Sequence, residues 1–318
     1  MTQTTHQILL QHNPQPTDIP HFCQPGFFFN ESEHLRQQRD GQFHLLTALN
    51  QTTQQADARC AFFVHSDGAV SPGAAPFGSI EFAATLSDSV LNEFLDSLTK
   101  AVHQAGAPTL RIVNYPHCYA PQQAGRLTTK LVEHGFRLIE SNPNFFLPVG
   151  SHPFDSDLAP AERRRLRKCR ENKFSFTHWQ DPSVDRVVDF IQETRQHQHY
   201  TLTLSPAYLA DLLLKFPDRF PVFVVTDGPN LAALTVAVRV RNDILYSFLP
   251  ASHADYRMFS PMVMLTDGLF TYCQQQDIRL LDLGVSLGEN HSPKPSLMRF
   301  KRNLGAQEMP KLVFEKML

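Results

Sequence analysis

Residues 250–260 carry several polar side chains directly before a helical pattern. Ser260 is followed by Pro261, an order that favours a helix N-cap and first turn. A helix N-terminus offers free backbone N–H groups and the positive end of the dipole, where a phosphate or carboxylate can bind. Arg257 adds a positive charge. The pattern predicts an anion site contacted by Ser252, Arg257 and Ser260, and the alternative is an ordinary surface loop.

A second segment with possible chemistry, residues 284–288, matches the nucleophile motif G-x-S-x-G with Ser286 at its centre. A hydrolase nucleophile needs a helix directly after the serine, followed by an acid and a histidine. Pro293 and Pro295 come too soon for a long helix, and His291 is the only later histidine. We therefore interpret the motif as a glycine-flanked strand end.

A third candidate is the basic run Arg163–Lys173, in which seven of eleven residues are Lys or Arg. On a helix they spread over most of the circumference and leave Leu166 and Cys169 to face inward. The run is either a solvated surface helix or a docking face for RNA or a phosphorylated ligand. His197 and His199 are two residues apart and share no helix face, so they predict no metal site.

Helical and strand patterns alternate along the chain. The elements that they predict must position the candidate functional residues named above. In the first half an apolar stripe predicts a helix over 87–105, and a strand over 109–113 follows. The second half predicts helices over 161–172, 183–197 and 206–216, a three-stranded meander, a helix from Ser260 and a strand over 279–285. The first 55 residues predict irregular structure and one strand, 42–49. This order indicates a mixed sheet with helices against it.

The two halves share a short repeat. The pattern F-V-x-[ST]-D-G occurs at residues 63–68 and again at 223–228, an offset of 160. In each half a helix and then a strand follow it, which predicts an internal duplication. Residues 150–160 are typical of a linker. We therefore predict domains at 1–150 and 151–318, of which the first is a reduced version of the second.

Composition limits the class of protein. With 318 residues, 42% of them apolar, the chain can bury a large core, which excludes disorder and collagen for the whole. A net charge of −2 makes a surface covered by nucleic acid unlikely. Five dispersed cysteines without C-x-x-C, and no signal-peptide pattern, predict a cytoplasmic protein. Its longest apolar run, 231–238, is too short to span a bilayer.

The order meander, loop, helix, strand, helix, strand resembles the GNAT-type N-acyltransferase fold. The duplication resembles the Fem-type peptidoglycan aminoacyltransferases and the related BioF2-like acetyltransferase group. Matching segments in the second half are 246–256, Asp282-Leu283-Gly284 and 299–305, the last similar to their F-K-x-x-x-G ending. In the first half, 71–78, Asn114-Tyr115-Pro116 and Gly135-Phe136 look similar. The resemblance implies an α/β fold of two tandem GNAT-like domains and transfer of an acyl or aminoacyl group to an amine.

The resemblance also implies a site, in the second half, where residues 248–252 lie beside 283–286 and offer backbone N–H groups to an acyl carbonyl. It implies acyl-CoA or aminoacyl-tRNA as donor, no metal, and a small-molecule or peptide amine as acceptor. The candidate catalytic residues are Tyr256, Ser286, Glu289 and His291. The candidate donor contacts are Ser252, Arg257 and Ser260. The candidate acceptor contacts are Asp282, Arg299 and Lys301, with an anionic partner expected for Lys301 and a purely structural role as the alternative for Asp282.

One departure from the family opens an alternative. The glycines of the GNAT pyrophosphate loop are missing, since no glycine occurs in 250–261. Close approach of backbone to a pyrophosphate normally uses glycine. A non-catalytic module that binds an acyl or peptidoglycan-type ligand is therefore a second hypothesis. Contact with tRNA through Arg163–Lys173 is a further expectation, and an RNA-binding protein is the third hypothesis.

Overall fold

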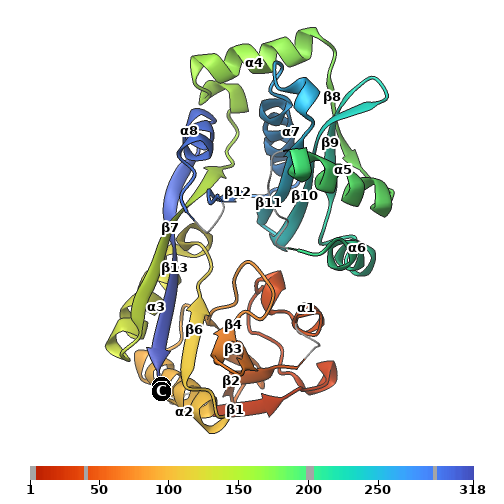
Figure 1. Cartoon of the computed structure of the whole chain (residues 1–318). Coiled ribbons are helices and arrows are strands. Elements are labelled where there is room, and N and C mark those ends of the chain that lie inside the picture. The colour runs from red at the N-terminus through yellow and green to blue at the C-terminus, as the bar shows by residue number, and fades with distance from the viewer. Residues whose placement is uncertain (1–4, 39–41, 198–203, 289–291) are drawn as a thin grey trace. The chain divides into compact units, whose positions relative to one another are not determined.

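The computed structural model describes residues 5–38, 42–197, 204–288 and 292–318. It divides into two compact units (Figure 1). Unit 1 comprises Met1–Pro143 and Met309–Leu318, and unit 2 comprises Asn144–Glu308. The chain passes from unit 1 to unit 2 inside strand β7 (Arg137–Pro148). The end of the chain thus belongs with the first half of the sequence.

Unit 1 is a mixed sheet with helices against it. Its strands, in spatial order, are β1 (His6–His12), β2 (His44–Asn50), β3 (Ala56–His65), β4 (Gly68–Ser71), β6 (Thr109–Val113) and β13 (Gln307–Met317), and β5 (Glu81–Phe82) pairs with β3. Its helices are α1 (Ser32–Leu35), α2 (Asp88–Gln104) and α3 (Pro121–Glu133). Strand β1 was not expected, because this edge strand pairs only with β2 and lacks a clear apolar alternation. Strand β2 is close to the predicted 42–49.

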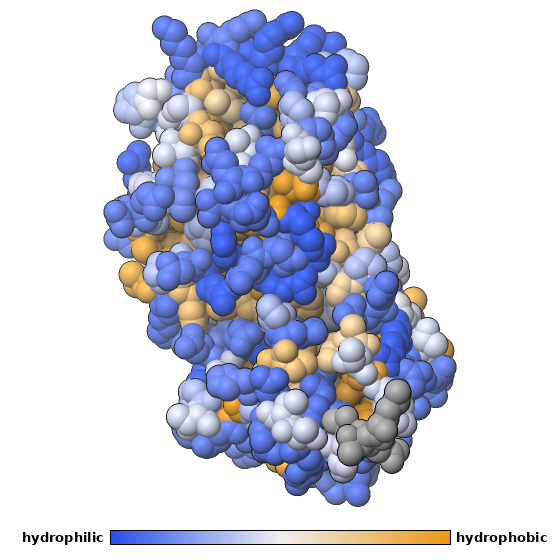
Figure 2. Space-filling view, turned by 180° about the vertical axis from the view of Figure 1, so that it is seen from behind, coloured by the Kyte–Doolittle hydropathy of each residue, from blue (hydrophilic) through white to orange (hydrophobic). Residues whose placement is uncertain are grey.

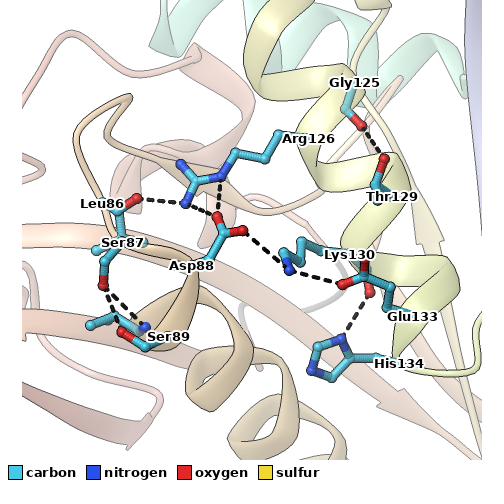
Figure 3. A network of polar contacts seen from close by, with 11 residues as sticks. Leu86, Ser87, Asp88, Ser89, Gly125, Arg126, Thr129, Lys130, Glu133 and His134 are labelled. Carbon is cyan, nitrogen blue, oxygen red and sulfur yellow. Dashed lines mark hydrogen bonds and ion pairs between the residues drawn. The ribbon is translucent and has the colours of Figure 1, made fainter.

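Helix α2 confirms the predicted stripe and is capped as its sequence suggests. Its buried face packs on the sheet with Leu91, Phe94, Leu95, Leu98 and Val102. The Ser87 hydroxyl accepts a hydrogen bond from Val90 N at 3.4 Å. Asp88 in the first turn accepts from Arg126 Nε of α3 at 2.8 Å and pairs with Lys130 at 3.3 Å (Figure 3). These ion pairs join the start of α2 to α3.

Unit 2 has the fuller mixed sheet. Its strands, in spatial order, are the end of β7, β12 (Leu280–Val285), β11 (Ile244–Ser252), β10 (Asn230–Arg241), β9 (Val222–Asp227) and β8 (Ser175–Trp179). Its helices are α4 (Pro160–Glu171), α5 (Val184–His197), α6 (Pro206–Lys215), α7 (Pro261–Gln275) and α8 (Pro295–Asn303), with a 3₁₀ turn, η6 (Ala254–Tyr256). Residues 232–238 of β10 are all buried, as expected for a strand covered on both faces. The helices and meander predicted for this half are confirmed within a few residues.

The duplication is visible in the order of elements. In unit 1, β3 runs antiparallel to β4, and β4 runs parallel to β6 across α2. In unit 2, β10 runs antiparallel to β11, and β11 runs parallel to β12 across α7. The F-V-x-[ST]-D-G repeat does not mark this equivalence. Its first copy forms the β3–β4 turn, but its second forms the β9–β10 turn, one hairpin too early. The equivalence of residues 63–68 with 223–228, which the repeat predicted, is therefore wrong.

Helix α7 approaches β8 closely at Gly268. A Cβ atom there would lie 2.2 Å from the ring of Phe176, so the ring would have to move. We expect Gly268→Ala to lower the free energy of unfolding of unit 2 by about 1–3 kcal/mol, the usual cost of overpacking. The single tryptophan, Trp179, lies in β8, so urea unfolding followed by its fluorescence reports on this unit. Thr271→Ala, on the exposed side of α7, is the control and should change little. Equal stability of both variants would contradict this packing.

In the described parts of the chain, none of the helices has the length and apolar character to cross a membrane. The face drawn in Figure 2 is mostly hydrophilic, with small apolar areas scattered between charged and polar ones.

Candidate active site

Strands β11 and β12 of unit 2 form a fork. They pair in parallel at only three positions, which end at Tyr246 opposite Asp282. Beyond that point β11 continues to Ser252 and β12 to Val285 without pairing to each other. On its other edge β11 stays paired with β10 as far as Ser252 opposite Ala233. The two strands therefore do not pair with each other in the region where the resemblance places the site.

Each strand of the fork carries an irregularity where the two diverge. Phe248 is an extra residue in β11, because Ser247 faces Ala237 and Leu249 faces the next residue back, Val236. Leu283 is an extra residue in β12, since Asp282 and Gly284 face the consecutive residues Phe146 and Phe145 of β7. Such bulges bend a strand and redirect its backbone groups. The two bulges open the fork, and the sequence pattern did not predict them.

The side chain of Lys301, in α8, contacts the end of β12, on one side of the fork. Its side chain is buried, and Nζ donates to the carbonyls of Gly284 at 2.9 Å and Val285 at 2.8 Å. Burial lowers the pKa of Lys301 from 10.5 to about 8, and the negative charge of Asp282 offsets part of that shift. Two backbone carbonyls thus take the place of the anionic partner expected from the sequence.

Asp282 holds the bulge in β12 together. Its Oδ1 accepts from Gly284 N and from Asn144 Nδ2 of β7, both at 2.7 Å. Gly284 has φ +71°, and a Cβ there would meet the Tyr246 ring at 2.9 Å, so this position requires glycine. Burial, together with the charge of Asp282, raises the pKa of Tyr246. These contacts match the structural alternative for Asp282, and they add Asn144 and Tyr246 to the residues that shape the site.

Ser286 follows the end of β12 and is 4% exposed. Its hydroxyl has no hydrogen-bond partner among the described residues, whereas its carbonyl accepts from Lys294 N at 2.9 Å. Helix α8 begins only at Pro295, so a hydrolase nucleophile turn is absent from this part of the described chain. The other two candidate catalytic residues, Glu289 and His291, lie outside the described residues.

The candidate donor contacts lie around the start of α7. Ser260 occupies the N-cap position with Pro261 first in the helix, but it has φ 56° and its side chain makes no capping hydrogen bond. Arg257 is exposed, and its guanidinium pairs with no carboxylate that the structure describes. Ser252 is the half-buried last residue of β11. Arg299, a candidate acceptor contact, lies exposed on α8.

Tyr256 in η6 faces a different neighbourhood. Its hydroxyl lies near Asp227 and Asn230 of the β9–β10 turn, and partial burial followed by the negative charge of Asp227 raises the pKa of Tyr256. Its ring packs edge-on against Phe174 at 5.7 Å. These contacts anchor the segment after β11 to the β9–β10 turn, and the sequence pattern did not reveal them.

The equivalent fork of unit 1 is filled by the chain itself. Strand β4 pairs with β6 up to Ser71 opposite Ile112, and the segment after Ser71 then returns between the strand ends. Gly78 N bonds Val113 O at 3.2 Å, and the Ser79 hydroxyl donates to Asn114 Oδ1 at 2.7 Å. A Cβ at Gly78 would meet Ser71 Oγ at 2.4 Å, so this segment packs closely against the end of β4.

Among the described residues, no three His, Cys, Asp or Glu side chains gather so that they could hold a metal ion. The groups that the fork presents are backbone amides and carbonyls, one buried carboxylate and one buried amine. These are suited to orienting and polarising a carbonyl compound.

Comparisons with known proteins agree with this geometry. Residues 161–302 match the family model of the acetyltransferase (GNAT) domain. The chain is similar in structure to FemX, with a TM-score of 0.69 and 11% identity over 92% of this chain and 93% of that one. It is also similar to the C-terminal domain of a putative lysylphosphatidylglycerol synthetase from Agrobacterium fabrum, with a TM-score of 0.57 and 13% identity over 81% of each chain.

A tandem GNAT protein from the clavulanic acid biosynthesis pathway matches with a TM-score of 0.53 and 10% identity over 86% of this chain and 82% of that one. No curated protein matches the sequence. The resemblance inferred from the sequence is confirmed at the level of the fold: residues 161–302 match the GNAT domain model, and the chain as a whole has the tandem GNAT fold.

Proposed function

We propose that unit 2 transfers an acyl or aminoacyl group from a thioester or ester donor to an amine. The open β11–β12 fork inside the matched GNAT domain is the observation that carries this proposal. The amine nitrogen forms a bond to the carbonyl carbon, and the bond from that carbon to the donor's sulfur or oxygen breaks. The amine loses one proton, and the departing thiolate or alkoxide gains one. Backbone N–H groups along the inner edge of β11 stabilise the carbonyl oxygen as it becomes negative.

Unit 1 serves in this proposal as an accessory domain. Its own fork is occupied by residues 72–79, so it lacks the space that unit 2 provides. The candidate residues of unit 2 then take distinct roles. Lys301 and Asp282 fix the carbonyls and amides of β12, and the buried hydroxyl of Ser286 lies at the end of that strand, where a departing group can receive a hydrogen bond.

The donor is acyl-CoA or aminoacyl-tRNA, and the protein works in the cytoplasm, where both are made. The basic run Arg163–Lys173, most of which lies in helix α4, supports tRNA as the donor. Many of its cations, however, already bind other groups of the protein. Arg163 donates to the Leu158 carbonyl at 3.1 Å, Arg165 pairs with Glu162 at 2.7 Å, and Arg170 pairs with Asp267 at 2.9 Å. Exposed cations with neither an ion pair nor a hydrogen bond from the side chain in the described structure are Arg164 and Lys173.

Arg257 offers a direct test of the donor site. It lies exposed at the start of α7, where it can add to the helix dipole. We expect Arg257→Ala to leave the melting temperature nearly unchanged and to weaken binding of acetyl-CoA or of an aminoacyl-tRNA, whichever binds, by about tenfold, or 1.4 kcal/mol. Calorimetric titration measures this. Arg137→Ala, exposed in unit 1, is the charge-matched control, and equal losses in the two variants would remove Arg257 from the site.

A second function, binding of an acyl or peptidoglycan-type ligand without turnover, is favoured by one observation. The segment before α7 contains no glycine, and Pro261 at its first position has no N–H to offer. Incubation with acetyl-CoA or an aminoacyl-tRNA and a mixture of amines, followed by mass spectrometry, separates the two. The transfer predicts an acylated amine. A ligand that raises the melting temperature without giving any product would favour the binding module.

A further inference from the structure

Arg195, near the end of α5, lies beside the open part of β11. Its guanidinium donates to the carbonyl of Pro250 at 3.3 Å. The side chain is half-buried, and burial lowers the pKa of Arg195 from its ordinary value. None of the roles in the proposed transfer uses this cation, although it contacts one strand of the fork.

The direction of the Pro250 carbonyl shows which edge of β11 the arginine occupies. Backbone groups of successive residues in an antiparallel pair point alternately towards and away from the partner strand. His253 N bonds the Ala232 carbonyl beside β10, so every second residue back from His253 faces β10, and Pro250 faces the opposite edge. That edge is the one that β12 leaves unpaired, so the guanidinium of Arg195 lies in the fork.

A second cation approaches the fork from the β12 side. Lys294 directly precedes α8, and its backbone N bonds the carbonyl of Ser286, just after the end of β12, at 2.9 Å. Burial, and then the positive charge of Arg195, lower the pKa of Lys294 from 10.5. The two cations are therefore neighbours, although one is held at β11 and the other at the end of β12.

The groups around this point favour an anionic ligand. Two neighbouring cations repel each other, and an anion placed between them removes that repulsion. A guanidinium binds a carboxylate particularly well, because two parallel N–H groups meet its two oxygens. The hydroxyl of Ser286, beside Lys294, is buried and has no hydrogen-bond partner among the described residues, which supports a ligand with polar atoms here.

Pro250 also indicates how far this anion lies from the reacting carbonyl. Proline has no backbone N–H, so a carbonyl oxygen on this edge of β11 takes its hydrogen bond elsewhere. The bulge at Phe248 is two residues away, and two residues of a strand span roughly 6.6 Å. A short dicarboxylic acyl group covers most of that length. Its carbonyl can therefore lie at the bulge while its carboxylate meets Arg195.

We infer that the fork of unit 2 binds an acyl group that carries its own carboxylate, with Arg195 and Lys294 on either side of that carboxylate. The group is succinyl-like on a thioester donor, or aspartyl on a tRNA. Its carboxylate takes no part in the exchange of bonds and serves to orient the carbonyl against β11. This inference rests on the proposed function for the reaction, whereas the affinity for the donor is measured without an acceptor.

Titration calorimetry of the whole chain with succinyl-CoA and butyryl-CoA tests the inference, because the two donors share a carbon skeleton and differ in the carboxylate. We expect succinyl-CoA to bind about tenfold or more tightly. One tRNA charged either with aspartate or with asparagine gives the same comparison for the other kind of donor. The preference should weaken with added salt, as expected for an interaction between charges.

The double variant Arg195→Gln/Lys294→Gln should lose this preference and keep the affinity of the wild type for butyryl-CoA. Retained binding of butyryl-CoA also verifies that the variant is folded. The matched control is Arg164→Gln/Lys173→Gln, which removes one arginine and one lysine from exposed positions of unit 2. It should bind succinyl-CoA more tightly than butyryl-CoA, as the wild type does.

Other outcomes overturn the inference in distinguishable ways. Equal affinities within both donor pairs, or a preference that survives in the double variant, would show that these cations do not select an acyl carboxylate. Loss of transfer to glycine but not to methylamine in the double variant would move the carboxylate from the acyl group to the acceptor. Transfer of the butyryl group in preference to the succinyl group would overturn this acyl class and leave the proposed transfer standing.

Discussion

Lys301→Met is expected to lower the free energy of unfolding of unit 2 by about 2 kcal/mol or more at neutral pH, because a buried acceptor left without a donor costs about 1–3 kcal/mol. Methionine keeps most of the length of the side chain but cannot donate to the carbonyls of Gly284 and Val285. Urea unfolding followed by Trp179 fluorescence measures the loss. The sequence analysis, by contrast, expected Lys301 to contact the acceptor.

The same substitution has a pH signature. The pKa of Lys301 falls from 10.5 to about 8 on folding, because the ammonium is buried. Between those values the unfolded chain binds more protons than the folded chain, so the wild type gains stability as pH rises through this window. The methionine variant lacks this group, and the stability difference should therefore grow from neutral pH towards pH 10.5. Lys173→Met, at an exposed lysine, should show no such growth. A difference that shrinks with pH would contradict the buried position of Lys301.

Asp282→Ala should have an effect at least as large, about 3 kcal/mol or more, since hydrogen bonds to charged groups contribute about 1.5–3 kcal/mol each. The substitution leaves Gly284 N and Asn144 Nδ2 without their acceptor inside the sheet. It also removes the negative charge that raises the pKa of Lys301, so that pKa should fall further below 10.5. Unfolding by urea, read from Trp179, gives the stability, and repeating it across pH gives the shift.

Asp282→Asn is the matched control. Its amide oxygen can still accept from Gly284 N, so its loss should be smaller than that of the alanine variant. If both variants unfold like the wild type, Asp282 does not hold the bulge, and its role as an acceptor contact regains support. If only the alanine variant is unstable and only that variant fails to transfer, the geometry of β12 is the requirement for activity; if the stable asparagine variant also fails to transfer, the charge of Asp282 is the requirement.

Much of the fold follows from sequence because long periodic patterns decide it. The stripe of α2, its Ser87 cap and strand β6 are where the apolar spacing and the cap residue place them. The same holds for helix α5 and strand β12, whose ends agree within a residue. The order of these correctly predicted helices and strands indicated the GNAT-like fold. Strand β1 was not predicted from the sequence, because an edge strand with one partner needs little apolar alternation.

The candidate site was only partly predictable. The location of the fork followed from the order of elements, but the bulges at Phe248 and Leu283 depend on how two strands meet a third. The burial of Lys301 could not be inferred, because a lysine in a short helix is usually exposed. Likewise one of the two partners of Asp282 is Asn144, which is 138 residues away in the sequence. The wrong strand alignment of the repeat has a similar cause, since Asp-Gly turns recur in any hairpin.

The central claim is that the open fork of unit 2, and not that of unit 1, receives the donor. Hydrogen–deuterium exchange with and without acetyl-CoA, and then with an aminoacyl-tRNA, tests it most directly. The account predicts slower exchange of backbone amides in 247–252 and at the start of α7 with one of these donors, and no change in 68–71 or 109–113 of unit 1. Protection of the unit 1 segments without protection of 247–252, or no protection by either donor, would contradict it.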